Sequence, residues 1–182
     1  MTRRRPLALP ALAVAALFAI LFGVSACGSS SEHKEVVEGE PVELGELQYN
    51  VIFSRFLNPS DNEDSAYLVG QPKPPPGSAY FGVFFEVHNE SEKPQTLADA
   101  FTIVDADHDH FEAAASESLY ALPFGADVEG QEQIPLVDST AQQGPIEGAV
   151  VIFELPATAS ENRPLILEIP GPEGPAEVTL DL

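Results

Sequence analysis

The stretch that decides the fold is Tyr80-Phe81-Gly82-Val83-Phe84-Phe85-Glu86-Val87, in which large apolar residues occupy every second position from Phe81. Successive side chains of a β-strand point to opposite faces, so the odd-numbered residues 81–87 would share one face. Phe84 adds an apolar side chain to the other face. The pattern predicts a central strand whose odd-numbered face is buried.

The same period of two recurs on both sides of this strand. Leu47, Tyr49, Val51 and Phe53 alternate with other residues, which implies one shared face. Similar segments follow at 101–105, 111–113, 151–155, 165–169 and 178–182. The Gly and Pro residues of 170–175 predict that the last two segments form a hairpin. Short alternating strands joined by turns predict an all-β, antiparallel β-sandwich over residues 42–182.

Three stretches depart from the alternation. Glu112–Leu122 is the one helix candidate, because it contains three consecutive alanines and ends before Pro123. Residues 58–78 contain five prolines and no strand pattern. A loop of that length in a compact domain is either functional or mobile. Residues 124–144 suggest one irregular edge strand with loops.

The central strand also carries a family resemblance. Tyr80–Val87, continued by His88-Asn89-Glu90-Ser91-Glu92-Lys93-Pro94, resembles the central strand and exit turn of a large family of exported immunoglobulin-like domains. That family is related to the immunoprotective extracellular antigens of actinobacteria. Phe101–Asp107 and Gly148–Pro156 are similar to two of its later strands. The resemblance spans about residues 47–182 and implies an immunoglobulin-like sandwich of seven to nine strands, often in lipoproteins of uncharacterised function.

The N-terminus has the organisation of an export signal. Three arginines at 3–5 precede an uncharged apolar segment, Leu7–Val24, and then Ser25-Ala26-Cys27 supplies small residues before a cysteine. This order predicts a signal peptide over residues 1–26. The alternative is a plain transmembrane helix, which needs about 20 apolar residues and no cleavage site. The arginines leave open whether export uses the general secretory or the twin-arginine route.

Val24-Ser25-Ala26-Cys27 resembles the lipobox of bacterial lipoproteins, and Cys27 is the only cysteine of the chain. The resemblance implies cleavage before Cys27 and acylation of its thiol, with palmitate-type chains that anchor the protein in the membrane. Small and polar residues follow Cys27, so residues 27–41 are predicted to be a flexible tether. We therefore expect a lipid-anchored protein on the extracytoplasmic face of the cell membrane.

The charge of the chain excludes several partners. Of 182 residues, 29 are acidic and 8 are basic, and removal of residues 1–26 leaves 5 basic side chains and a formal charge of −24. Such a body cannot neutralise phosphates, so nucleic-acid binding is excluded. Anionic membrane surfaces would repel it, so membrane attachment depends on Cys27. A single cysteine also excludes an internal disulfide and a zinc site built from several thiolates.

The densest group of potential metal ligands is Asp105-Ala106-Asp107-His108-Asp109-His110-Phe111-Glu112. Compared with a calcium-binding loop, it has His110 where glycine is needed and Ser116 where glutamate is needed. Two histidines on one side of an extended segment would instead suit zinc, copper or nickel. Asp is also a favoured turn residue, so we predict a solvated acidic turn without a metal cofactor. The candidate ligands are His108, His110, Asp105, Asp107 and Asp109.

No motif for catalysis is visible. The chain has no Gly-x-Ser-x-Gly sequence, no phosphate-binding glycine loop and no free cysteine once Cys27 is acylated. We expect a non-catalytic module of the cell envelope, without a cofactor, that contacts an envelope protein or polymer. The alternative is a lipoprotein that binds a small ligand or divalent metal for a transporter. An exposed apolar patch at Leu119–Phe124 would favour the first function, and a deep pocket between the sheets would favour the second.

Overall fold

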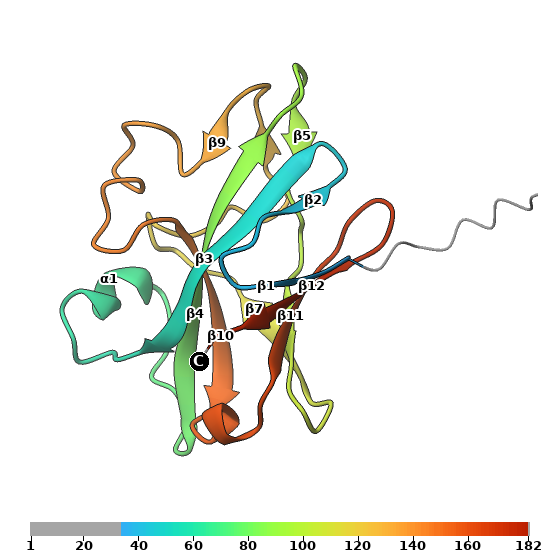
Figure 1. The fold of residues 1–182 in the computed structure, drawn as a ribbon. Helices are drawn as coiled ribbons and strands as arrows, with labels where there is room; N and C mark the ends of the chain where they lie inside the picture. The colour runs from blue at the N-terminus through green and yellow to red at the C-terminus, as the bar shows by residue number, and fades with distance from the viewer. Residues whose placement is uncertain (1–33, 182) are drawn as a thin grey trace, which may run out of the picture.

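Residues Ser78–Asn89 form strand β4, and the odd-numbered residues 81–87 are fully buried, as the alternation predicts. β4 lies within one of two sheets that face each other (Figure 1). The computed structural model describes residues 34–181. The predicted signal peptide and Cys27 therefore lie outside the described residues.

The first sheet, called the β4 sheet, is built on antiparallel pairs with β4 in its interior. β10 and β3 flank β4, with Val151 opposite Val83 and Val51 opposite Phe85. β2 pairs with the outer edge of β3, and β9 pairs with β4 beyond the start of β10. The bounds are β2 Val42–Leu44, β3 Leu47–Leu57, β9 Gln133–Ile134 and β10 Ala149–Pro156.

The second sheet, called the β11 sheet, has the order β1-β12-β11-β6-β7. The predicted C-terminal hairpin is confirmed, with Leu167 of β11 opposite Val178 of β12. β7 pairs with β6 and then, through Ala113 and Ala114, with β10, so it joins the two sheets. The bounds are β1 Lys34–Val37, β6 Thr102–Val104, β7 His110–Ala114, β11 Leu165–Ile169 and β12 Ala176–Leu180.

Three smaller elements complete the described chain. β5, Gln95–Thr96, pairs with β8, Asp127–Val128, as a separate two-stranded sheet. A single turn of α-helix, α1, spans Asp64–Tyr67, and a 3₁₀ turn spans Ala159–Glu161. The described residues thus contain twelve strands rather than seven to nine, because several pairings of two to four residues carry no visible alternation.

The main core lies between the two sheets and confirms the predicted all-β sandwich. Inward side chains of both sheets are buried there, including Phe81, Phe85, Phe153, Leu167 and Val178. Burial of such side chains stabilises the fold by roughly 1.5–3 kcal/mol each. Among the named strands of residues 34–181, β1 pairs parallel with β12, and an isolated bridge between Ala121 and Val150 is also parallel.

β3 changes face at a β-bulge. Val51 lies opposite Phe85, whereas Phe53, two residues later, lies opposite the adjacent residue Phe84. Ile52 is therefore an inserted residue, and odd-numbered positions after it point away from the main core. The prediction that Val51 and Phe53 share one face is wrong, since Val51 is buried and Phe53 is 40% exposed.

The loop of residues 58–77, between β3 and β4, packs on the outer face of the β4 sheet, where Figure 1 shows α1. Tyr67 is fully buried and its ring meets Phe84 edge-on, with ring centres 5.1 Å apart. The Tyr80 hydroxyl donates a hydrogen bond of 2.7 Å to the carbonyl oxygen of Pro72. The loop completes a second cluster, called the outer cluster: Leu57, Tyr67, Leu68, Tyr80, Phe84, Val150 and Ile152. It is a packed cover of the sheet, which accounts for its length.

The helix expected at Glu112–Leu122 does not form. The segment begins inside β7 and continues as an irregular chain to Ala121. Pairing of Phe111 with Ile103 and of Ala113 with Phe153 takes these residues into the sheets. Such tertiary pairing overrides the modest helix preference of alanine. Residues 124–144 contain β8 and β9, two short strands instead of one.

The predicted tether, residues 27–41, is too long, because its end belongs to the domain. Lys34–Val37 forms β1 and pairs with β12. In the following turn, the Glu38 carboxylate accepts hydrogen bonds from the backbone N–H groups of Ser54 (3.2 Å) and Asp181 (3.1 Å). Glu38 thus joins β3 of one sheet to the end of β12 in the other. The sandwich therefore includes residues 34–41.

Candidate functional site

The outer face of the β11 sheet is open, unlike that of the β4 sheet. Both buried clusters lie elsewhere, one between the sheets and one outside the β4 sheet. Along β11 and β12, half-exposed residues that point outward alternate with buried residues that point into the core. No segment within residues 34–181 contributes a buried cluster on this face, so the face is a candidate surface for contact with another molecule.

A trough of about 450 Å³ crosses this face. Its floor is aliphatic, because Ile166 of β11 lies opposite Val104 of β6, and Val104 lies opposite His110 of β7. Pro164, just before β11, extends the apolar floor. The polar residues that line the trough are Asp105, His108, His110, Glu168 and Glu177. Its volume falls within the range of ligand pockets, about 300–1,000 Å³.

Carboxylates lie in one row across the strands beside this trough. Glu35 of β1 is opposite Glu177 of β12, and Glu177 is opposite Glu168 of β11. Continuing the row, Glu168 is opposite Thr102, which is opposite Glu112 of β7. Like charges directly opposite each other on neighbouring strands are destabilising.

The turn between β6 and β7 closes one end of the trough. Asp105 is 6% exposed, and its Oδ1 accepts hydrogen bonds of 3.0 Å from the N–H groups of Asp107 and Asp109. Asn162 donates through Nδ2 to Asp105 and Asp107. Burial raises the pKa of Asp105, but these hydrogen bonds outweigh burial and lower it overall. His108 occupies the left-handed region, with φ of 64°, as tight turns require.

The structure brings together only part of the predicted metal group. His108, His110 and Asp105 line the trough, but the Asp105 carboxylate is held by hydrogen bonds within the turn. Asp107 and Asp109 lie outside the lining. Within residues 34–181, no three or more His, Cys, Asp or Glu side chains are grouped as a metal ion requires. The segment forms an acidic turn.

Sequence reasoning missed Glu168 and Glu177, the carboxylates of the trough. A signal for them existed, since the alternation of the C-terminal hairpin places both on its polar side. Their convergence with His108 and His110 depends on β11 pairing with β6, more than 60 residues earlier in the chain. No local sequence pattern predicts the pairing of β11 with β6.

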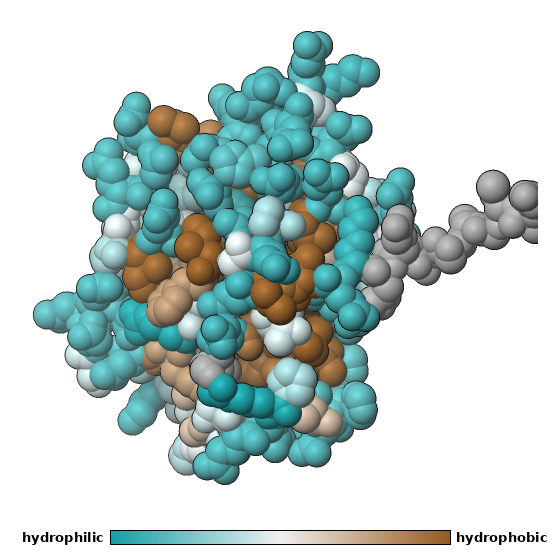
Figure 2. Space-filling view, in the orientation of Figure 1, coloured by the Kyte–Doolittle hydropathy of each residue, from teal (hydrophilic) through white to brown (hydrophobic). Residues whose placement is uncertain are grey.

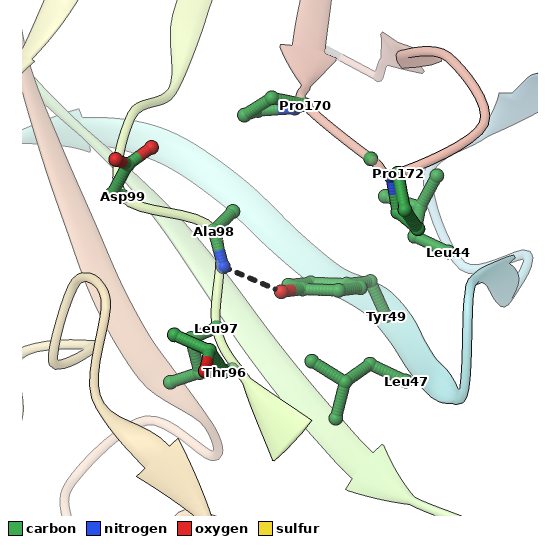
Figure 3. Close-up of a pocket in the computed structure, with 10 residues that line it drawn as sticks. Leu44, Leu47, Tyr49, Thr96, Leu97, Ala98, Asp99, Pro170 and Pro172 are labelled. Atoms are coloured by element: carbon green, nitrogen blue, oxygen red, sulfur yellow. Dashed lines mark hydrogen bonds between the residues drawn. The ribbon is translucent and has the colours of Figure 1, made fainter.

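A second hollow lies at one end of the sandwich, between the sheets (Figure 3). Leu44, Leu47, Leu97 and two prolines line it, and the Tyr49 hydroxyl accepts a hydrogen bond of 2.9 Å from the N–H of Ala98. Burial raises the pKa of Tyr49, although this hydrogen bond acts in the opposite direction. The hollow has about 230 Å³, below the usual size of ligand pockets.

The apolar patch expected at Leu119–Phe124 does not form as a unit. Leu119 is 79% exposed, but Leu122 is buried in the main core. Tyr120 packs on Tyr67, and Phe124 on Phe101, with ring centres 5.2 Å apart in both pairs. Figure 2 shows a mostly hydrophilic surface, with apolar side chains gathered over β3 and near β1.

His88 lies on the outer face of the β4 sheet, where its Nε2 is 3.4 Å from a carboxylate oxygen of Glu86. The pair is partly exposed, which agrees with the half-exposed positions expected on a solvated sheet face.

No helix among residues 34–181 is long and apolar enough to cross a membrane.

Comparison with solved structures supports the fold. The chain is similar to an uncharacterized β-sandwich protein from Clostridium difficile, with a TM-score of 0.51 and 13% identity over 82% of this chain and 95% of that chain. It is also similar to the yjhA protein of Bacillus subtilis, with a TM-score of 0.53 and 12% identity over 82% of this chain and 99% of that chain. Identities this low show the fold alone. No family model and no curated protein matches the chain.

Proposed function

We propose that this chain is an extracytoplasmic lipoprotein, anchored in the cell membrane through Cys27, whose sandwich is a non-catalytic binding module of the envelope. The anchor is supported by Val24-Ser25-Ala26-Cys27 and by the position of the only cysteine. Two acyl chains on one residue would provide the double anchor that stable attachment requires. The acidic body cannot supply attachment to an anionic surface by itself.

The observation that carries the binding function is the trough on the open face of the β11 sheet. It combines an aliphatic floor with a few polar side chains, a composition typical of binding sites. Its size and openness fit a protruding part of a larger partner. A catalytic role has no comparable support, because a fold by itself confers no reaction.

The small-ligand or metal-binding alternative is supported by the volume of the trough and by the two imidazoles of His108 and His110 that line it. Two imidazoles alone leave a metal site incomplete. We therefore place this function second. We further propose kinship with the exported immunoglobulin-like domains related to the immunoprotective extracellular antigens, on the strength of the Tyr80–Pro94 and Gly148–Pro156 segments.

The anchor is tested by mass spectrometry of the N-terminal peptide of the protein purified from membranes. We expect a terminus at Cys27 with a diacylglyceryl mass increase, and no lipid label in Cys27→Ala. An unmodified thiol at Cys27, or a mature terminus beyond it, would exclude a lipoprotein.

The binding function is tested by capture of envelope components with the soluble fragment 28–182. Ile166→Lys should abolish capture, because the new side chain fills the trough and can pair with its carboxylates. Val69→Lys is the matched control, since Val69 is 47% exposed within the 58–77 loop, outside the trough. Equal capture by both variants would show that the trough is not the contact surface.

A further inference from the structure

The trough on the open β11 sheet has two chemical properties that select an occupant. Its floor is aliphatic, through Val104, Pro164 and Ile166, and carboxylates of Glu168 and Glu177 lie along one side. A Lys or Arg side chain matches both properties, because its methylene stem packs on apolar surface while its charged head reaches a carboxylate.

We propose that the trough binds Lys or Arg side chains carried by an extended segment of a basic partner protein. This inference rests on the proposed function of the sandwich as a binding module and specifies its partner. The charge of the mature body, −24, would steer such a segment toward the domain over distances of about a Debye length.

Other occupants are less compatible with the charge of the domain. A second copy of this chain would bring another −24 against the same face. Anionic lipid headgroups and nucleic-acid phosphates are repelled for the same reason. A neutral polymer could donate hydrogen bonds to the carboxylates of Glu168 and Glu177, but it would not neutralise their charge. A basic segment does both.

The row of carboxylates also predicts a conflict between stability and binding. Glu168 is directly opposite Glu177, and carboxylates at such positions repel each other. A bound ammonium or guanidinium group would offset that repulsion. Glu168→Gln should therefore stabilise the free domain and weaken binding, whereas a purely structural residue would change stability without changing binding.

The experiment measures fluorescence anisotropy of labelled (Lys-Ala)₅ with the soluble fragment 28–182, at physiological salt. (Gln-Ala)₅ and (Glu-Ala)₅ are the peptide controls. Glu154→Gln is the matched variant, because Glu154 is exposed on the outer face of the β4 sheet, opposite Tyr80, and its loss changes the net charge equally. Glu168→Gln should weaken (Lys-Ala)₅ binding about fivefold more than Glu154→Gln does. The same substitution should raise Tm by about 1–3 °C above that of Glu154→Gln.

Equal binding by the two variants would overturn the proposal, because the affinity would then come from the net negative charge of the domain and not from the trough. Binding of (Gln-Ala)₅ as tight as that of (Lys-Ala)₅ would overturn the choice of a basic partner. Either failure leaves the binding function standing if Ile166→Lys still abolishes capture of envelope components. Loss of that dependence on Ile166 contradicts the binding function itself.

Discussion

The carboxylate of Asp64 pairs with the guanidinium of Arg55, and this ion pair fastens the 58–77 loop to β3. Asp64 is 3% exposed, and its Oδ2 accepts hydrogen bonds from Arg55 Nη1 (3.0 Å) and from the N–H of Asn58 (2.7 Å). Arg55 points outward only because the bulge at Ile52 has reversed the face of β3. The attachment of the loop through this ion pair therefore depends on the bulge.

Arg55→Ala should lower the free energy of unfolding by about 2–3 kcal/mol, because it leaves the buried Asp64 carboxylate without its counter-ion. Because the side chain of Arg55 is 31% exposed, the expected loss of stability is smaller than for a fully buried ion pair. Urea denaturation measures the change. Lys73→Ala removes an exposed cation from the same loop and should change stability by less than about 0.5 kcal/mol. Equal losses in both variants would contradict a specific role for the pair.

Stability should fall as the pH drops below about 4. Burial raises the pKa of Asp64 and Asp105, but hydrogen bonds, including that from Arg55, outweigh it and hold both below the ordinary 3.8. Groups with a lowered folded pKa stabilise above the unfolded value, and that contribution is lost as pH falls through the folded pKa. Tm measured from pH 7 to 2.5 should fall less steeply for Asp105→Asn.

Asn89→Ala should cost about 2–3 kcal/mol, because Asn89 organises the turn after β4. Asn89 is 2% exposed; its Nδ2 donates to the carbonyl oxygens of Lys93 (2.8 Å) and Val128 (2.9 Å), and its Oδ1 accepts from the N–H of Ser91 (3.0 Å). Asn50→Ala is the control, since Asn50 Oδ1 is buried without a hydrogen-bond partner. Thermal melts should separate the two variants. Comparable losses of stability in both would contradict the role of Asn89 in stabilising the turn.

The fragment 42–182 should melt about 5–10 °C below the fragment 34–182. The shorter fragment lacks β1 and Glu38, which joins β3 to the end of β12. Glu38→Ala in the longer fragment should give part of this loss, whereas Glu147→Ala, at an exposed position, should not. Circular dichroism melts provide the comparison. Identical melts of the two fragments would show that the domain begins at β2.

Titration calorimetry of the mature chain with zinc, copper, nickel and calcium should detect only weak binding. The negative field concentrates divalent cations, and the β6–β7 turn offers no third ligand beside His108 and His110 within the described residues. Submicromolar binding that disappears in the double variant His108→Ala/His110→Ala would contradict this and favour the metal-binding alternative.

Much of the fold followed from local alternation. The period of two placed Phe81, Val83, Phe85 and Val87 on one buried face, and it identified the β11–β12 hairpin from its flanking turn. These features are predictable because the faces of a strand repeat within a few residues. The sequence also supplied the charge that limits the partners, and the lipobox-like segment at Cys27, which remains a prediction.

Tertiary structure decided which partner each face meets. The inserted Ile52 turns Phe53 away from the core, although the pattern of β3 shows no interruption. β1 exists because β12 provides a partner about 140 residues later in the chain, and β7 replaces an expected helix because β6 and β10 flank it. The trough arises in the same way, since Glu168 and His110 are brought to one face only by the pairing of β11, β6 and β7. Local sequence determines the face of its strand to which a side chain points. Long-range strand pairing determines which side chains become its neighbours, and the trough depends on those neighbours.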